Sequence, residues 1–427
     1  MTNTGGLKFK KFDLHIHTPA SEDYKDKNAT AEDIVNQSIN KGLSGIAITD
    51  HQTGDWIDSI KEVAKGKDLI VFPGIELKVH GGEEGIHLVI IFDIDKNTEH
   101  VTAFLNRLEI YQHKGKTSIT DKTVIEVAKE LQQYDRDAIL ILAHCDSTFG
   151  ADSDIRGEQR SNIFKPEWIC LLGAEASETN FLDEDKKQKH TRIVDLFDGG
   201  FPDFHKKKLG VYQASDAHSL EEIGSKYTYF KVDDPITIED IRQSLIDRDT
   251  RIRQSFEYKE FTYPRIVSLK ITSGFLADQG FSFHEGLNSI LGAKGSGKSL
   301  VIEFLRFCLN QQPNNQEILS DHKDKLDKCL KIHGEIEVVF IDDSGKEYMI
   351  KRVLNPAEAN LITVIDPSDN SEKNFQVEQV FPVLFLSQNE IIKIAEDKTG
   401  ASQRRFIDQF FDFYKHQHEI EKLNNDL

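Results

Sequence analysis

A glycine-rich stretch in the second half of the chain, LGAKGSGKS at 291–299, constrains the fold most strongly. An apolar run precedes it at 287–290, and residues 300–305 have the apolar spacing of a helix. We therefore expect a strand, a phosphate-binding loop and a helix whose N-terminus faces the phosphates. In such a loop Lys298 would reach the β- and γ-phosphates of ATP, and the Ser299 hydroxyl would bind Mg²⁺. The candidate nucleotide-binding residues of the loop are Gly292, Lys294, Gly295, Gly297, Lys298 and Ser299.

The first half of the chain repeatedly places histidines and acids beside short apolar runs. The run at 8–16 leads to His15 and His17, whose spacing puts both imidazoles on one face of a strand. Five further runs are flanked in the same way, by Asp50 and His51, Glu76, His87, His144, and Asp216 with His218. Any single histidine of this kind is more often a hydrogen-bonded structural residue. Burying the whole series without a metal would be costly, so we interpret it as a metal site.

Helical patterns alternate with these runs, for example at 30–41 and 122–133. This order predicts parallel strands joined by crossover helices, and hence an α/β fold. An α/β barrel gathers polar residues from the C-terminal ends of its strands on one rim, where its active site is built. Nitrogen and oxygen ligands without thiolates suit Zn²⁺, Mn²⁺ or Fe²⁺.

Residues 8–220 resemble a PHP domain, the polymerase and histidinol phosphatase family, in four motifs. The motifs are DLHIHTPAS at 13–21, ITDH at 48–51, AH at 143–144 and SDAH at 215–218. The resemblance implies a distorted (β/α)7 barrel that binds two or three divalent metals and hydrolyses phosphoesters. It implies one metal at His15, His17, Glu76 and Asp216, a second between Glu76, His87 and His144, and a third between Asp23, His51 and His218. The implied catalytic residues are His15, His17, Glu76, His144, Asp216 and His218. The family often has a histidine near the position of Asp23, and Glu175 would line the site without binding metal.

Residues 258–264 are the expected boundary between a first domain, 1–257, and a second, 258–427. In the second domain we expect a strand at 265–271, a β-hairpin around 342–345 and an apolar strand at 383–386 that leads to Gln388. The stretch 338–343 imitates a Walker B strand, but turn residues and a returning strand follow it, so we reject that interpretation. A helical run at 404–414 precedes a charged segment at 418–423 that is typical of the start of a coiled coil.

This second half resembles the N-terminal lobe of an SMC or Rad50-like ATPase head, in which Gln388 would be the Q-loop glutamine. The sequence contains no LSGGQ signature and no convincing Walker B strand, which that family carries in a C-terminal lobe beyond the coiled coil. The resemblance therefore implies a truncated or separately expressed N-terminal part that binds ATP weakly and hydrolyses it poorly. It also implies a homodimer or higher homo-oligomer, since the composite ATP site of the family needs two heads.

The net charge of −19 argues against a surface uniformly adapted to nucleic acid, although it permits a local basic groove. Two basic clusters are either solvated loops, the commoner case, or a rim that tracks phosphates. They are Arg156, Arg160, Lys186, Lys187, Lys189 and Arg192, and the run at 206–208. Four scattered cysteines, together with no signal-peptide or membrane-spanning pattern, predict a cytoplasmic protein without structural disulfides.

The two halves together resemble the bacterial PHP-ATPase proteins associated with defence against phage. That resemblance implies an ATP-gated metallo-phosphoesterase, and our leading hypothesis is a nuclease that acts on foreign DNA rather than RNA. A small-molecule phosphatase or nucleotide hydrolase with the ATPase head as a sensor is the second hypothesis. The third is a DNA-bridging clamp in which the PHP domain is a scaffold, although a full ligand set argues against a retired site.

Overall fold

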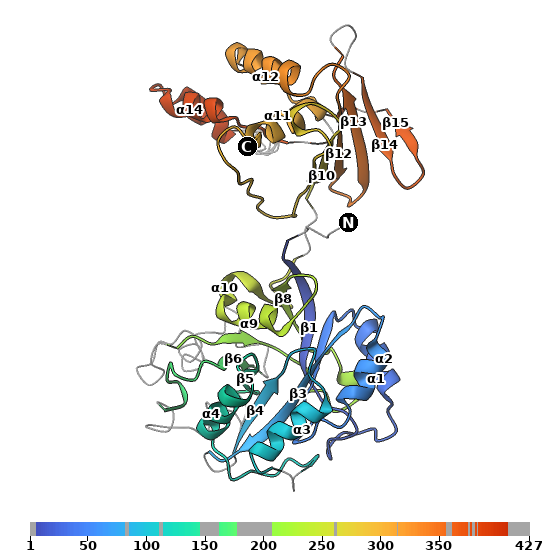
Figure 1. Cartoon of the computed structure of the whole chain (residues 1–427), viewed down its shortest axis with the longest axis vertical. Coiled ribbons are helices and arrows are strands. Elements are labelled where there is room, and N and C mark those ends of the chain that lie inside the picture. Colours follow the sequence, from blue (N-terminus) through green and yellow to red (C-terminus); the bar gives the residue numbers. More distant parts are fainter. Residues whose placement is uncertain are drawn as a thin grey trace, which may run out of the picture. The chain divides into compact units, whose positions relative to one another are not determined.

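The computed structural model describes residues 6–81, 85–110, 114–145, 162–176, 207–259, 263–313, 315–355, 361–374, 376–377, 381 and 383–408. The chain divides into two compact units (Figure 1). The N-terminal unit is Gly6–Lys259, and the C-terminal unit is Glu260–Leu427 together with Met1–Gly5. Each unit has its own sheet and its own helices, so each is described by itself.

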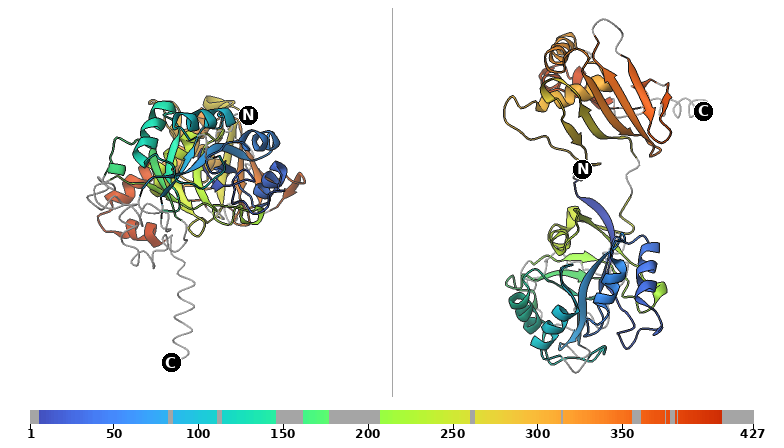
Figure 2. Two further views of the ribbon diagram at one scale, coloured as in Figure 1. Left: turned by 90° about the horizontal axis from the view of Figure 1, so that it is seen from below. Right: turned by 45° about the vertical axis from the view of Figure 1, so that its right-hand side comes forward.

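The N-terminal unit is an α/β fold around a nine-stranded sheet with the order β7-β6-β5-β4-β3-β2-β1-β8-β9. Its strands are β1 (Lys8–Ile16), β2 (Gly45–Ile48), β3 (Ile70–Val79), β4 (Ile86–Ile91), β5 (Ile139–Leu142), β6 (Leu171–Glu175), β7 (Gly210–Tyr212), β8 (Thr228–Val232) and β9 (Ile252–Gln254). Its helices are α1 (Ala31–Asn40), α2 (Ile57–Ala64), α3 (Thr98–Arg107), α4 (Val124–Tyr134), α9 (Ile238–Ile246) and α10 (Arg248–Arg251). They lie around the outside of a nearly closed, barrel-like sheet, which confirms the predicted fold class (Figures 1 and 2).

We predicted parallel strands, but the sheet contains both parallel and antiparallel pairs. β1, β2 and β3 are parallel to one another, as are β5, β6 and β7. β4 runs antiparallel to both of its neighbours, and β8 and β9 add an antiparallel edge beside β1. The connection between β3 and β4 is residues 80–85, which is too short for a crossover helix and therefore forces a hairpin. As a result β4 brings its N-terminal end, with His87, to the rim where the parallel strands end.

The interior of this sheet is packed with large apolar side chains. Phe12, Leu14, Phe72 and Phe230 are fully buried in it. β3 passes so close to its neighbours at Gly74 that an added Cβ would lie 2.8 Å from the carbonyl oxygen of Ile90 and 3.0 Å from that of Ile48. A side chain at this position would push the central strands apart.

The C-terminal unit has a six-stranded sheet with the order β11-β10-β12-β13-β14-β15, and every strand pair in it is antiparallel. The strands are β10 (Arg265–Ile271), β11 (Gly280–Ser282), β12 (Glu335–Ile341), β13 (Glu347–Val353), β14 (Ile362–Asp366) and β15 (Ser371–Lys373). The helices are α11 (Lys298–Cys308), α12 (Gln316–Cys329), α14 (Gln388–Glu396) and α15 (Ala401–Asp408). Both views place α11 and α12 on the same side of the sheet (Figures 1 and 2). The hairpin β12–β13 confirms that the stretch 338–343 is no Walker B strand.

Two predicted strands of this unit do not form. Residues 287–291 and 383–386 lie outside every strand, and Leu287 and Leu291 are 93% and 90% exposed. An extended segment is stabilised by pairing with a neighbour, and no strand among the described residues pairs with either one. The predicted helix at 404–414 is present as α15 up to Asp408; its remainder and the segment at 418–423 lie outside the described residues.

Buried ion pairs connect three helices of the C-terminal unit. Glu303 of α11 contacts His322 of α12, with 2.5 Å between Oε2 and Nδ1. Arg306 of α11 donates from Nη2 to Glu390 Oε2 of α14 at 2.7 Å, and the Arg306 side chain is only 3% exposed. Breaking a pair of this kind leaves an uncompensated buried charge.

No helix among the described residues combines the length and apolar character needed to cross a bilayer. All four cysteines are free thiols, as expected from their spacing.

Candidate metal centre

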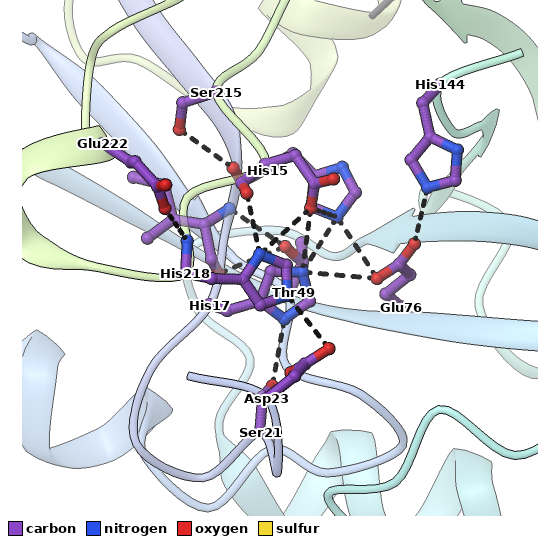
Figure 3. Close-up of polar contacts among 12 residues, drawn as sticks. His15, His17, Ser21, Asp23, Thr49, Glu76, His144, Ser215, His218 and Glu222 are labelled. Atoms are coloured by element: carbon purple, nitrogen blue, oxygen red, sulfur yellow. Dashed lines mark hydrogen bonds and ion pairs between the residues drawn. The ribbon is translucent and has the colours of Figure 1, made fainter. Parts of the chain in front are cut away.

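The nine predicted metal ligands meet at one rim of the nine-stranded sheet. Figure 3 shows six of them, His15, His17, Asp23, Glu76, His144 and His218. His15 lies near the end of β1, Glu76 in β3 and His87 near the start of β4, and the others lie on the loops that follow β1, β2, β5 and β7. Three groups have potential ligand atoms within 4.8 Å of one another: His15, His17, Glu76 and Asp216; Glu76, His87 and His144; and His17, His51 and His218.

The first group surrounds a single point between β1, β3 and the loop after β7. The two Nε2 atoms of His15 and His17 face each other at 3.2 Å. Glu76 Oε2 lies 3.4 Å from the first and 3.3 Å from the second, and Asp216 Oδ1 lies 3.3 and 3.2 Å from them. Two ring nitrogens and two carboxylate oxygens that converge in this way are a donor set for a divalent cation.

Glu76 links the first group to the second. Its Oε1 atom lies 2.6 Å from His87 Nδ1 and 3.3 Å from His144 Nε2, while Oε2 faces the first group. A carboxylate that offers one oxygen to each of two neighbouring donor sets is arranged to bridge two metals.

The third group is completed by Asp23. Its Oδ2 atom lies 3.2 Å from His51 Nε2 and 3.3 Å from His218 Nε2. The rings of His17 and His218 are stacked, with centroids 4.1 Å apart. The Asp23 side chain is 42% exposed, so this group forms the solvent side of the centre.

The electrostatics of the cluster fit bound cations. Burial alone would lower the pKa of His17, but contacts with Asp216 and Glu76 outweigh it and raise the pKa to about 9. Burial alone would raise the pKa of Glu76, but the surrounding imidazoles, beginning with His51, hold it well below its usual value. The raised pKa of His17 and the lowered pKa of Glu76 both mean that the buried carboxylates require positive charge beside them. Protons or divalent cations can supply that charge.

Two of the predicted ligands have backbone conformations that residues other than glycine rarely adopt. His144 has a φ of 25° and Asp216 a φ of 52°. Such conformations cost of the order of 1–3 kcal/mol and persist where the surrounding structure imposes them, commonly at functional sites.

The predicted phosphate-binding residues of the C-terminal unit, apart from Gln388, lie in one loop and in the first turn of α11, which follows it. Gly297 caps the helix with a φ of 92°, and Gly295 has a φ of 80°, so both positions favour glycine. The Lys298 ammonium donates to the carbonyl oxygens of Gly292 and Ala293 at 2.7 Å each, while Lys294 is exposed. Ser299 lies in the first turn of α11. Gln388 is the first residue of α14, and its side chain lies outside the described residues.

Comparison with known proteins identifies both halves. The PHP domain family matches residues 13–197, and an AAA domain family matches residues 267–427. The chain carries a PHP domain followed by an AAA-type ATPase domain.

Three relatives share parts of this sequence. A 5′-3′ exoribonuclease of Haemophilus influenzae is 30% identical over 113 residues, which are 26% of this chain and 39% of that protein. The DNA repair protein RecN of Rickettsia felis is 25% identical over 169 residues, 36% of this chain and 29% of RecN. The DNA double-strand break repair Rad50 ATPase of Nanoarchaeum equitans is 29% identical over 134 residues, 27% of this chain and 16% of Rad50. The chain thus spans well under two thirds of the length of each relative.

Two buried side chains, Glu175 and Ser21, contact the Nδ1 atoms of His15 and His17 and orient their rings. Glu175, at the end of β6, places Oε2 2.7 Å from His15 Nδ1. Ser21 Oγ lies 3.0 Å from His17 Nδ1 and donates to Asp50 Oδ1 at 2.7 Å. Fixing Nδ1 in this way turns Nε2 toward the centre. We expected Glu175 to line the site, but the contributions of Ser21 and Asp50 were not predicted, because a serine and an acid beside a motif are common.

Two residues of the predicted basic rim, Lys207 and Lys208, belong to the described part of the chain. Arg156, Arg160, Lys186, Lys187, Lys189, Arg192 and Lys206 lie outside the described residues. Lys207 is half-buried and donates to the carbonyl oxygen of Trp168, and burial lowers its pKa to about 8. Lys208 is exposed.

Proposed function

We propose that the PHP domain is a nuclease whose access to DNA is regulated by ATP in the neighbouring domain, in bacterial defence against phage. The observation that carries the proposal is the convergence of nine imidazole and carboxylate ligands, with Glu76 placed between two of the groups. A scaffold without chemistry would have no need to bury and orient so many ionisable groups.

The donor set fits two or three divalent ions such as Zn²⁺, Mn²⁺ or Fe²⁺. When bound, such ions supply an activated water and polarise a phosphoryl oxygen. The PHP residues themselves divide the remaining work. Glu175 and Ser21 hold the rings of His15 and His17 in position, while the partly exposed Asp23, Asp216 and His218 mark the side from which a phosphate group enters.

Nucleic acid is favoured over a small phosphoester by the kind of relatives found. One is named an exoribonuclease, and two are named as DNA repair proteins, so we propose DNA before RNA. The ATPase domain would bind ATP and Mg²⁺ through Lys298 and Ser299, with Gln388 as a further candidate, and would pair with a second copy. Free thiols are compatible with a cytoplasmic setting.

The test uses the full chain with Mn²⁺ on linear and circular DNA, single-stranded RNA, nucleotides and sugar phosphates. We expect DNA cleavage that His15→Ala abolishes, while His80→Ala, which removes an exposed histidine outside the centre, retains it. Hydrolysis of small phosphoesters with no cleavage of DNA or RNA would reject the nuclease proposal.

ATP regulation is tested with Lys298→Ala. This variant should lose any change in cleavage rate that ATP produces, while keeping the cleavage measured without ATP. Equal responses of the variant and the wild type to ATP would contradict the regulation.

A further inference from the structure

One face of the N-terminal unit carries interleaved aromatic and basic side chains on three adjacent strands and on the segment that follows β9. We call it the aromatic–basic face, and its members are Phe9, Lys11, Tyr229, Lys231, Arg253 and Tyr258. Side chains alternate along a strand, and the even-numbered neighbours Phe12, Phe230 and Ile252 are buried in the core. Phe9 and Lys11 in the first half of β1, Tyr229 and Lys231 in β8, and Arg253 in β9 therefore share the opposite side, where the structure leaves them partly exposed.

The strand register sets rings beside cations across this face. Phe9 lies opposite Lys231, and Lys11 lies opposite Tyr229. Tyr229 in turn lies opposite Arg253 and stacks on Tyr258, with ring centroids 3.9 Å apart.

The cations lie against the rings. Lys231 Nζ and Arg253 Cζ are 5.6 and 5.5 Å from the centroid of the Phe9 ring. Lys11 Nζ is 3.7 Å from the ring centroid of Tyr227, the residue just before β8. The distance from a ring to its neighbouring cation is therefore similar to the distance between a base and a phosphate within one nucleotide.

The three cations of the face are not in direct contact with carboxylates of the described part of the chain. Among the residues that the structure describes, neither Lys11, Lys231 nor Arg253 forms an ion pair with a carboxylate. Lys10, on the same strand but facing the other way, is paired with Asp234 at 2.6 Å. In a chain with a net charge of −19, three such cations among aromatic rings form a local attraction for an anion.

We propose that the aromatic–basic face is a docking site for a single strand of nucleic acid outside the metal centre. The proposal rests on the nuclease function proposed above and adds to it the strandedness of the substrate. Aromatic rings can stack on the bases of a single strand whatever its sequence, while the cations follow its phosphates. A duplex hides its base faces and could use only the cations.

The face and the metal centre are joined by the same strand. Six positions along β1 separate Phe9 from His15, or about 20 Å at the rise of a strand, and the register of β1 shifts between Asp13 and Ile16, where the strand reaches the centre. Between the aromatic–basic face and the metal centre, the Asp13 carboxylate accepts hydrogen bonds from the backbone N–H groups of Ser215 and Gly224. These bonds hold the loop that carries Asp216 and His218 against β1, between the face and the centre. A stacked strand of about six nucleotides spans that distance.

The test measures binding without cleavage, using the full chain in EDTA and the fluorescence anisotropy of a labelled 20-nucleotide oligo(dT). We expect Tyr229→Ala to raise Kd about tenfold, because a stacked base is lost, and Tyr229→Phe to bind like the wild type. Lys231→Gln should weaken binding severalfold and reduce its salt dependence by about one ion, which tests the face independently if the tyrosine variant folds poorly. Lys67→Gln, a change at an exposed lysine beyond α2, is the matched control and should change nothing.

Two further readouts decide the interpretation. A blunt duplex of the same length should lose less than twofold in affinity on Tyr229→Ala, and with Mn²⁺ the cleavage of a four-nucleotide substrate should be unaffected by that change. The proposal is overturned if the wild type does not bind the oligonucleotide, if Tyr229→Ala binds it normally, or if duplex binding falls equally. If the wild type cleaves DNA and Tyr229→Ala binds the oligonucleotide normally, the docking site is rejected and the nuclease function stands. If the wild type binds the oligonucleotide but cleaves no nucleic acid, the nuclease function is rejected and the docking site stands.

Discussion

The metal centre and the nucleotide loop differ in how fully the described part of the chain builds them. The candidate metal centre brings the nine side chains predicted as ligands together, and three of them, His15, His17 and Glu76, are at most 1% exposed. The nucleotide loop is exposed from 291 to 296, and the segment that leads into it pairs with no described strand. A site enclosed by one sheet can therefore be preorganised by that sheet, whereas a loop at the edge of a sheet depends on a further surface to enclose its ligand.

The largest expected effect tests whether the metal centre acts as a single unit. Glu76→Gln removes the negative charge that two donor groups share, so both should bind metal weakly. We expect hydrolysis to fall at least about a thousandfold, comparable to the loss of a principal electrostatic contributor, and the metal content measured by mass spectrometry to fall with it. The control is Glu130→Gln, the same change at a partly exposed glutamate that pairs with Arg107 at the surface. Loss of one metal with retained hydrolysis would show that the groups act separately.

The next effect asks whether the two domains are stable independently of each other. Arg306→Ala leaves Glu390 without its buried partner and should destabilise the ATPase domain by about 3–5 kcal/mol. Calorimetry of the full chain should show the ATPase transition shifted to lower temperature and the PHP transition unchanged. Added Mn²⁺ should raise only the PHP transition, because a ligand stabilises the state that binds it. A single transition that moves as a whole would contradict independent domains.

A smaller effect is expected behind the metal centre. Glu175→Gln keeps the size of the side chain but weakens the hold on His15, and should lower metal affinity or hydrolysis by about 10–100-fold. Rescue by raised Mn²⁺ concentration would identify a positioning role. An effect as large as that of Glu76→Gln, without such rescue, would instead make Glu175 a ligand.

The sequence was most informative where residues close together in the chain act together. The pair His15 and His17, the acids at strand ends and the loop at 291–299 were all predictable from local spacing. The grouping of ligands from distant segments came only from the PHP resemblance, and contacts outside its motifs could not be predicted: the bond of Glu175 to His15 spans 160 positions, and the pairing of β8 with β1 that creates the aromatic–basic face joins residues more than 200 positions apart. The strand expected at 287–291 failed for the same reason, because local composition cannot supply a pairing partner.

Gly74 serves both the packing of the central strands and the position of a predicted metal ligand. It stands two residues before Glu76, on a strand whose neighbours leave no room for a Cβ atom. Any substitution there would displace β3, and with it the Glu76 carboxylate that both donor groups share. Selection on hydrolysis should therefore act on this glycine as strictly as on the histidines, and libraries that redesign the centre should leave it unvaried.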